Sequence, residues 1–254
     1  MEIKDKDGKD LVRIYSYGND RMFTLFNNGI IVKVGICFPW QEYLLNHFKS
    51  EEFVDTPIEM RTDKGAGVFR FGTYYDLLHD TLVNNGAIAV TTLSMLFKPK
   101  IIVEFGVYAG STTMLLAKLN PTAKVYGIDK FEKHLTPNFE LPIGYVAKLQ
   151  QLSNVEYVIK NSWEFDMEGQ VDFCFIDGDH CGDAPYLDSW KAWENRNQNT
   201  DWCIAWDDYH PNNPDVYNAV NKFVKEVGYP LQKAWSWYWI GNKTLDESKL
   251  VNVV

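Results

Sequence analysis

The second half of the chain repeats a pattern that leaves few folds open. From residue 101 onward, short apolar runs alternate with segments of helical periodicity, and several of the runs end on a carboxylate. The predicted strands are 101–105, 125–128, 155–159, 171–176 and 202–206, and the predicted helices between them are 112–119, 145–152 and 186–195. A long amphipathic helix and two aromatic-rich runs, 231–235 and 237–240, follow. This alternation indicates an α/β fold with a Rossmann-like, mostly parallel sheet that has helices on both faces.

The first part of the chain lacks this regular alternation of strands and helices. Residues 22–26 and 30–34 flank Asn27-Asn28-Gly29 and predict a β-hairpin, because Asn-Gly tolerates the positive φ angles of a tight turn. Helical segments are predicted at 40–48, 75–82 and 88–96, with a loop at 61–72. We therefore expect an N-terminal extension over residues 1–86 and the Rossmann-like domain over residues 87–254. A lid, an oligomer contact and a sheet extension all stay open as roles for the extension.

Charge and composition limit the classes of binding partner and the cellular location to expect. The formal net charge of −9, with no Lys/Arg run longer than two residues, argues against nucleic acid and anionic membranes and favours a small-molecule partner. Cys37, Cys174, Cys181 and Cys203 form no CxxC pair and are expected to be reduced thiols. The N-terminus is too polar for a signal peptide, and the apolar stretch 87–97 is too short to cross a bilayer. A cytoplasmic location is therefore expected.

A glycine-containing turn follows the first strand of the regular half. Gly106 and Gly110 let the backbone turn sharply near a ligand, and the N-terminus of the next helix offers free N–H groups. The spacing is Gly-x-x-x-Gly, which argues against a dinucleotide pyrophosphate site. Asp129 ends the second strand, 23 positions after Gly106, where a carboxylate can accept hydrogen bonds from ribose hydroxyls. Each feature alone is common in α/β proteins, whereas both in register favour a nucleoside site.

These residues carry a resemblance to a known family. The turn Glu104-x-Gly106-x-x-x-Gly110, together with Gly127-Ile128-Asp129, resembles class I S-adenosylmethionine-dependent methyltransferases. The resemblance implies a seven-stranded methyltransferase sheet with S-adenosylmethionine as cofactor. The cofactor-binding residues that it implies are Glu104, Gly106 and Gly110 at the methionine part, Tyr108 and Thr112 nearby, Asp129 at the ribose, and Asn161 and Ser162 near the adenine.

Carboxylates also follow the fourth and fifth predicted strands. Asp177 begins the sequence Asp-Gly-Asp-His that ends at His180, and Asp207-Asp208 follow the next strand. Neighbouring parallel strands bring such residues together, and three carboxylates at one edge need a hard cation such as Mg²⁺ to neutralise them. His180 is then placed to take a proton from an acceptor hydroxyl. Alternatively, Asp177-Gly178 is an ordinary turn, Asp208 caps the next helix and His180 is a solvated loop residue.

This second motif resembles the metal-dependent small-molecule O-methyltransferases, in particular the branch that acts on macrolide sugars, and more distantly catechol O-methyltransferase. The resemblance implies that Asp177, Asp207 and Asp208 are metal ligands and that His180 is the general base, with Asp177 also contributing to catalysis and to the cofactor site. Two segments depart from the family pattern, 181–185 and 200–202, and both concern the substrate side.

The expected function is therefore methyl transfer from S-adenosylmethionine, with Mg²⁺ or a similar divalent cation, to a hydroxyl of a small molecule such as a sugar or a diol. Two alternatives stay open: a metal-dependent hydroxylase-type enzyme on the same fold, and a nucleoside-binding regulator without turnover. The identity of the acceptor and the formation of a homo-oligomer also stay open.

Overall fold

The computed structural model describes residues 1–5, 7–18, 20–27, 29–36, 41, 45, 78, 86–135, 140–234 and 237–245. The chain divides between Ile88 and Ala89 into two compact units, of which the second runs to Leu245. The domain boundary expected between residues 86 and 87, and the role of the extension, stay predictions.

The N-terminal unit contains an antiparallel sheet whose four strands follow one another in chain order. These strands are β1 (Glu2–Lys4), β2 (Asp10–Tyr17), β3 (Asp20–Asn27) and β4 (Ile30–Ile36). The predicted hairpin is confirmed, because Asn27 pairs with Ile30 and Gly29 has a φ of +77°. Of the predicted helices 40–48 and 75–82, the structure describes only Gln41, Leu45 and Leu78, all with helical backbone, and the loop 61–72 lies outside the described residues.

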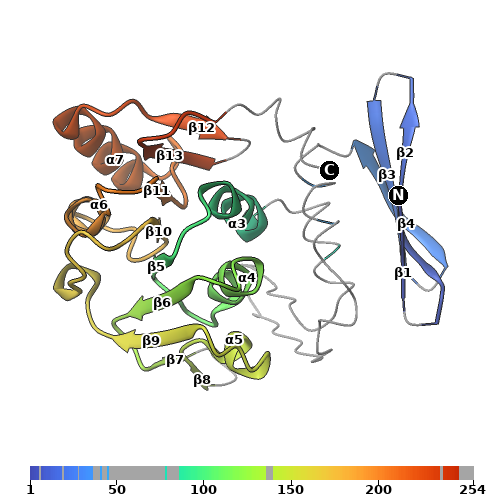
Figure 1. Cartoon of the computed structure of the whole chain (residues 1–254), viewed down its shortest axis with the longest axis horizontal. Coiled ribbons are helices and arrows are strands. Elements are labelled where there is room, and N and C mark those ends of the chain that lie inside the picture. Colours follow the sequence, from blue (N-terminus) through green and yellow to red (C-terminus); the bar gives the residue numbers. More distant parts are fainter. Residues whose placement is uncertain are drawn as a thin grey trace. The chain divides into compact units, whose positions relative to one another are not determined.

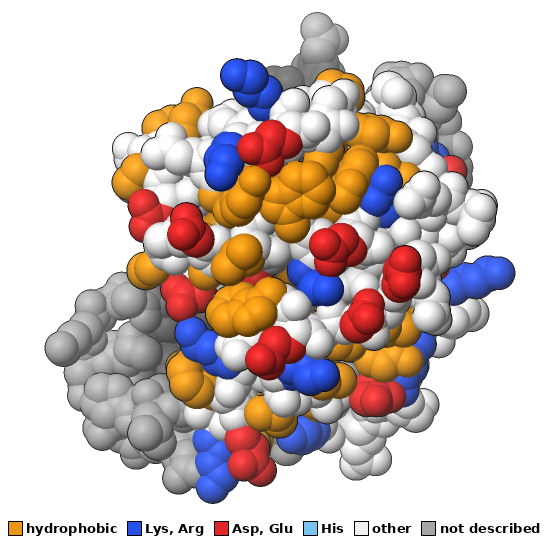
Figure 2. Space-filling view, turned by 90° about the vertical axis from the view of Figure 1, so that its left-hand side faces the viewer, with side chains coloured by type: hydrophobic (Ala, Val, Ile, Leu, Met, Phe, Trp, Pro, Cys, Tyr) orange, Lys and Arg blue, Asp and Glu red, His pale blue; other side chains and the backbone are white. Residues whose placement is uncertain are grey.

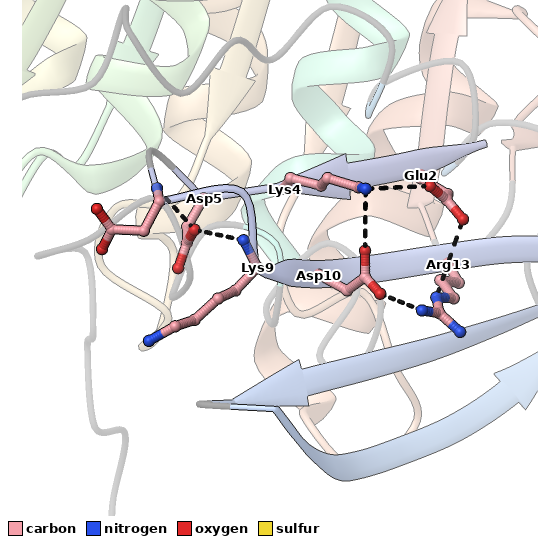
Figure 3. Close-up of polar contacts among 7 residues, drawn as sticks. Glu2, Lys4, Asp5, Lys9, Asp10 and Arg13 are labelled. Atoms are coloured by element: carbon pink, nitrogen blue, oxygen red, sulfur yellow. Dashed lines mark hydrogen bonds and ion pairs between the residues drawn. The ribbon is translucent and has the colours of Figure 1, made fainter.

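Ion pairs link β1 and β2 on the surface of this sheet (Figure 3). Lys4 Nζ lies 3.5 Å from a Glu2 carboxylate oxygen and 3.8 Å from one of Asp10. Arg13 pairs with Asp10 and lies 4.0 Å from Glu2. The Glu2, Lys4 and Arg13 side chains are exposed, and such pairs typically contribute about 0–1 kcal/mol each. This network therefore adds little to the stability of the sheet.

A mostly parallel seven-stranded sheet forms the centre of the second unit, and the predicted fold is confirmed. Its order is β12-β13-β11-β10-β5-β6-β9, and β13 alone runs antiparallel to its two neighbours, β11 and β12. The strands are β5 (Ile101–Phe105), β6 (Lys124–Asp129), β9 (Val155–Ile159), β10 (Phe173–Ile176), β11 (Cys203–Trp206), β12 (Gln232–Ala234) and β13 (Trp237–Gly241). The fourth strand begins at Phe173 rather than at 171, where an isolated bridge joins Val171 to Arg196.

Helices cover both faces of this sheet. In Figure 1 the sheet lies between α3, α4 and α5 on one side and α6 and α7 on the other. The helices are α3 (Gly86–Phe97), α4 (Ser111–Leu119), α5 (Tyr145–Leu149), α6 (Ala184–Asn195) and α7 (Pro214–Val227), with a 3₁₀ turn η3 (Ser162–Glu164) after β9. A small hairpin of β7 (Lys133–Leu135) and β8 (Glu140–Pro142) was not predicted. Helix α5 is shorter than the predicted 145–152, and Gln151 has a φ of +53° there.

The core explains why the central strands β10 and β11 are apolar along their whole length. On one face, Phe223 of α7 packs against Trp206 of β11 with ring centroids 5.9 Å apart. On the other face, Phe97 of α3 meets Trp239 of β13 edge to face at 5.3 Å. Because both faces of these strands are covered, their residues do not alternate between apolar and polar, and each strand is a continuous hydrophobic run in the sequence.

The side of the molecule seen in Figure 2 shows charged side chains scattered among hydrophobic ones. None of the described helices combines the length and hydrophobicity needed to cross a membrane.

Candidate functional site

The glycine turn between β5 and α4 is shaped by the backbone that packs against it. Gly106 has a φ of +86°, and a Cβ there would lie 1.9 Å from the backbone carbonyl oxygen of Asp177. The Gly106 N–H donates to the Ile128 carbonyl oxygen at 2.9 Å. Only glycine fits this position, since both the dihedral angle and the approach of the β10 end exclude a side chain.

Gly110 is fixed in the same way at the start of α4. It is the N-cap with a φ of +81°, its N–H donates to the Val107 carbonyl at 2.8 Å, and a Cβ would lie 2.6 Å from the Cα of Gly144. Ser111 Oγ, at the first residue of α4, is buried and has no hydrogen-bond partner among the described residues. The helix N-terminus thus combines unsatisfied N–H groups with an unsatisfied hydroxyl, which suits a polar ligand.

Asp129 fastens this turn to the end of β6. Its Oδ2 accepts the backbone N–H groups of Val107 and Tyr108 at 3.0 and 3.1 Å, and its Oδ1 accepts that of Phe131 at 2.9 Å. The residue is 7% exposed. Asp129 therefore has a structural use in addition to the ribose contact predicted for it, which stays a prediction.

Glu104, on β5, is fully buried and accepts a hydrogen bond from the Thr113 hydroxyl. Burial raises the pKa of Glu104 well above its usual value; the Thr113 hydrogen bond acts the other way, and the nearby charges of Asp177 and Asp129 raise the pKa further. Its neutral form is thus favoured. Glu104 shapes the electrostatics behind the turn and does not line the cavity at the carboxyl ends of the strands.

A cavity of about 390 Å³ opens at the carboxyl ends of β5, β6, β9 and β10. Of the predicted cofactor residues, the structure brings Gly106, Tyr108, Asp129, Asn161, Ser162 and Asp177 to its wall, and leaves Glu104, Gly110 and Thr112 out of it. The other lining residues are Ile128, Lys130, Phe131, Lys160, Trp163, Gly178, Asp179 and Asp188. The wall carries four carboxylates and two lysines, so it favours a ligand with positive charge.

Three of these lining residues stand out because sequence reasoning missed them. Phe131 and Trp163 are exposed aromatic residues, 51% and 40% accessible, that follow the ends of β6 and β9. Asp188 lies on α6 in line with the buried residues Ala192 and Asn195. Helical spacing that puts an acid on a buried face was the available signal for Asp188, and nearness to strand ends was the signal for the two rings.

The acidic motif lies beside this cavity. Strands β10 and β11 are neighbours, as predicted, with Ile176 opposite Trp206, so Asp177 and Asp207 leave the sheet side by side. Asp177, Asp207 and His180 each offer one ligand atom, and these atoms all lie within 4.8 Å of one another. Two carboxylate oxygens and an imidazole nitrogen at this spacing can hold a divalent cation.

The electrostatics of this group are unfavourable without a cation. Burial raises the pKa of Asp207 to about 8, with the charges of Asp177 and Asp208 adding to it. The Asp177 carboxylate, whose Oδ1 lies 3.6 Å from His180 Nε2, raises the pKa of His180, while burial opposes that shift. The Nε2 atom is buried and has no hydrogen-bond partner among the described residues. Such an unsatisfied group of acids and imidazole is what a bound cation would stabilise.

Asp208 lies beside His180. Its side chain is 57% exposed, its φ is +52°, and its Oδ2 lies 3.4 Å from His180 Nδ1. The close group, meaning the three residues Asp177, His180 and Asp207 whose ligand atoms lie within 4.8 Å of one another, includes the histidine that the sequence predicts as the base. Asp208 contacts that histidine. Its role as a metal ligand stays a prediction. His210 is exposed, and its Nδ1 accepts the Asn212 N–H at 3.1 Å.

No protein-family model and no curated protein sequence matches the chain. Among solved structures, a SAM-dependent methyltransferase from Aquifex aeolicus is similar, with 18% identity and a TM-score of 0.44 over 61% of this chain and 88% of that one. The O-methyltransferase TomG from Streptomyces achromogenes, in complex with SAM, has 14% identity and a TM-score of 0.42 over 62% and 78%. The SAH-bound methyltransferase PaMTH1 from Podospora anserina has 14% identity and a TM-score of 0.44 over 61% and 76%. These likenesses concern the fold alone.

Proposed function

We propose that this chain is an S-adenosylmethionine-dependent methyltransferase that transfers a methyl group to a hydroxyl of a small molecule with the help of a divalent cation such as Mg²⁺. One observation carries the proposal. Asp177 lines the cavity at the glycine turn and also belongs to the close group with Asp207 and His180. A nucleoside cavity and an acidic group that share one residue are adjacent, as a transfer between two bound molecules requires.

The residues of the cavity suit this cofactor. The wall is rich in carboxylates, the α4 N-terminus has an unsatisfied buried hydroxyl at Ser111, and Phe131 and Trp163 offer ring surfaces. When bound, S-adenosylmethionine supplies a methyl group on a positively charged sulfonium, and negative wall charge favours that cation. The role that we assign to Asp129 is to hold the turn in the binding conformation and to accept ribose hydroxyls.

Asp177 and Asp207 are the residues that would hold the metal, with His180 or Asp208 beside them. When bound, a divalent cation fixes the acceptor oxygen and lowers the pKa of its hydroxyl. Support comes from the Asp207 carboxyl group: burial, and then the charges of Asp177 and Asp208, raise its pKa, so a bound cation would stabilise its ionised form. Sugars and vicinal diols, with paired hydroxyl oxygens, are the acceptor class that we propose.

The role that we assign to His180 is to take the proton of the acceptor hydroxyl at Nε2. This nitrogen makes no hydrogen bond within the described residues, with Asp177 Oδ1 at 3.6 Å, and Asp208 lies near Nδ1, where it would orient and stabilise the imidazolium form. Neutralisation of Asp177 and Asp207 by a bound cation would lower the pKa of His180 and leave the imidazole free to accept the proton.

The test is an assay of the full chain with S-adenosylmethionine and a panel of sugars, vicinal diols and catechols. Mass spectrometry should detect a methylated acceptor and an equal amount of S-adenosylhomocysteine with Mg²⁺, and neither product after treatment with EDTA. Addition of an oxygen atom to the acceptor would indicate a hydroxylase instead. Calorimetry that finds no binding of S-adenosylmethionine would overturn the proposal, and equal turnover in EDTA would overturn its metal part.

A further inference from the structure

Asp188 on α6 is a buried carboxylate in the wall of the cavity that the proposed cofactor site does not yet use. The residue is 1% exposed overall and still contributes to the lining. Its Oδ1 accepts a hydrogen bond from the Ser162 hydroxyl. Its Oδ2 stands 2.8 Å from the position that a Cβ on Gly178 would occupy, so the glycine leaves room for this oxygen.

The carboxylate is poorly satisfied by the protein itself. Within the described part of the chain, Asp188 accepts one hydrogen bond, whereas Asp129 accepts three backbone N–H groups and Asp172 accepts four donors. None of the ion pairs among the described residues includes Asp188, and the nearby Lys130 pairs with Asp179 at 2.9 Å. Burial raises the pKa of Asp188 to about 6, and the Ser162 hydrogen bond opposes the shift. A buried carboxylate with so few donors is available to a ligand that brings one.

The neighbours of Asp188 indicate which part of a nucleoside it faces. Ser162 and Trp163 follow β9, and Phe131 follows β6, and all three line the same cavity as Asp188. Aromatic side chains at a cavity wall suit a planar heterocycle. Asp129 and the glycine turn lie at the ends of β5 and β6, where the ribose and methionine parts are expected.

Resting on the proposed function, we infer that Asp188 reads the nucleobase: its carboxylate accepts a hydrogen bond from the exocyclic amino group of adenine. The cavity is therefore selective for a 6-amino purine. A 6-oxo purine presents a carbonyl oxygen at that position, which repels a carboxylate and leaves it without a donor. A site built to accept an N–H rejects the analogue that lacks it, because the buried acceptor is then unpaired.

The experiment compares S-adenosylhomocysteine with S-inosylhomocysteine, its 6-oxo analogue, by calorimetry on the full chain at pH 8. The wild type should bind the adenosyl compound at least about tenfold more tightly, which is the typical effect of one hydrogen bond to a charged group. Asp188→Asn should narrow this ratio to within about threefold, mainly by tightening the inosyl compound, since the side-chain amide can donate to the 6-oxo group. A gain in binding cannot come from misfolding.

Two further variants make the test sharp. Asp188→Ala should weaken the adenosyl compound about tenfold and remove the preference. Ser189→Ala is the matched control on the same helix, because Ser189 is buried, bonds to the Pro185 carbonyl and the Trp206 indole, and does not line the cavity. Its ratio should equal that of the wild type.

The failures are distinguishable. Equal binding of both compounds by the wild type, or a wild-type ratio in Asp188→Asn, would overturn the role of Asp188 and leave the proposed cofactor site standing. Binding of neither compound by the wild type would overturn the proposed function together with this inference.

Discussion

Carboxylates stand at both ends of the central sheet, buried at the amino end and half-buried at the carboxyl end, and their surroundings differ. At the amino end of β10, Asp172 is 3% exposed and accepts four hydrogen bonds. Two come from the backbone N–H groups of Lys100 and Ile101 at 2.8 and 3.0 Å, one from the Asn197 amide at 3.0 Å, and one from the Thr200 hydroxyl at 2.6 Å. This carboxylate joins β10, the start of β5 and the loop before β11.

At the carboxyl end of the same strands, the acids face one another. Asp207 lies beside Asp177 with its pKa raised to about 8, and the nearby Nε2 of His180 has no hydrogen-bond partner among the described residues. The comparison teaches that burial of an acid does not by itself mark a functional site. The two ends differ in hydrogen bonding: Asp172, with four donors, supports the fold, whereas Asp207 faces other carboxylates and can use a bound cation.

The largest expected effect is a loss of activity when an acid at the carboxyl end of the sheet is substituted. Asp207→Asn should lower the rate of methyl transfer by roughly 10²- to 10³-fold, because it removes charge that the bound cation needs, while the fold is kept. The rate is measured as S-adenosylhomocysteine formed at saturating S-adenosylmethionine. Asp201→Asn is the control, since Asp201 lies just before β11, exposed and paired with Lys243 at 3.0 Å, and should leave the rate unchanged. A fully active Asp207→Asn would contradict the assignment.

The next effect is a loss of stability, without a loss of cofactor affinity, when the acid at the amino end of the sheet is substituted. Asp172→Ala should lower the free energy of unfolding by about 3 kcal/mol, because two backbone N–H groups and two side chains lose a buried acceptor. Urea denaturation measures the loss, and calorimetry should find the affinity for S-adenosylmethionine unchanged in the folded protein. A loss below about 1 kcal/mol would mean that the amino end is not the satisfied, structural end that the comparison requires.

The smallest effect concerns pH in the absence of metal. The pKa of Asp207 is raised in the folded state, so the protonated residue adds stability that is fully present below its unfolded pKa and is lost as the pH rises to about 8. In EDTA, the free energy of unfolding of the wild type should therefore fall relative to that of Asp207→Asn between pH 4 and pH 8. Mg²⁺ at pH 8 should remove this disadvantage of the wild type. Parallel pH profiles of the two proteins would contradict the shift.

Part of the site was predictable because it depends on local rules. Gly106 and Gly110 had to be glycines for a sharp turn, and Asp129, Asp177 and Asp207 follow apolar strands, so parallel pairing brings them to one edge. The actual partners of the glycines could not be predicted. The side chain that each glycine avoids would collide with the Asp177 carbonyl or with Gly144, from segments far along the chain.

The sequence by itself determined the α/β alternation, the hairpin at Gly29 and the order of acids along the strand ends, because strand and turn preferences act over neighbouring residues. Only the tertiary structure decided that Asp188 enters the cavity wall, that His180 lies between Asp177 and Asp208, and that Asp172 is satisfied. The physical reason is that hydrogen bonding and burial depend on which segments meet in space, and distances along the chain do not encode this.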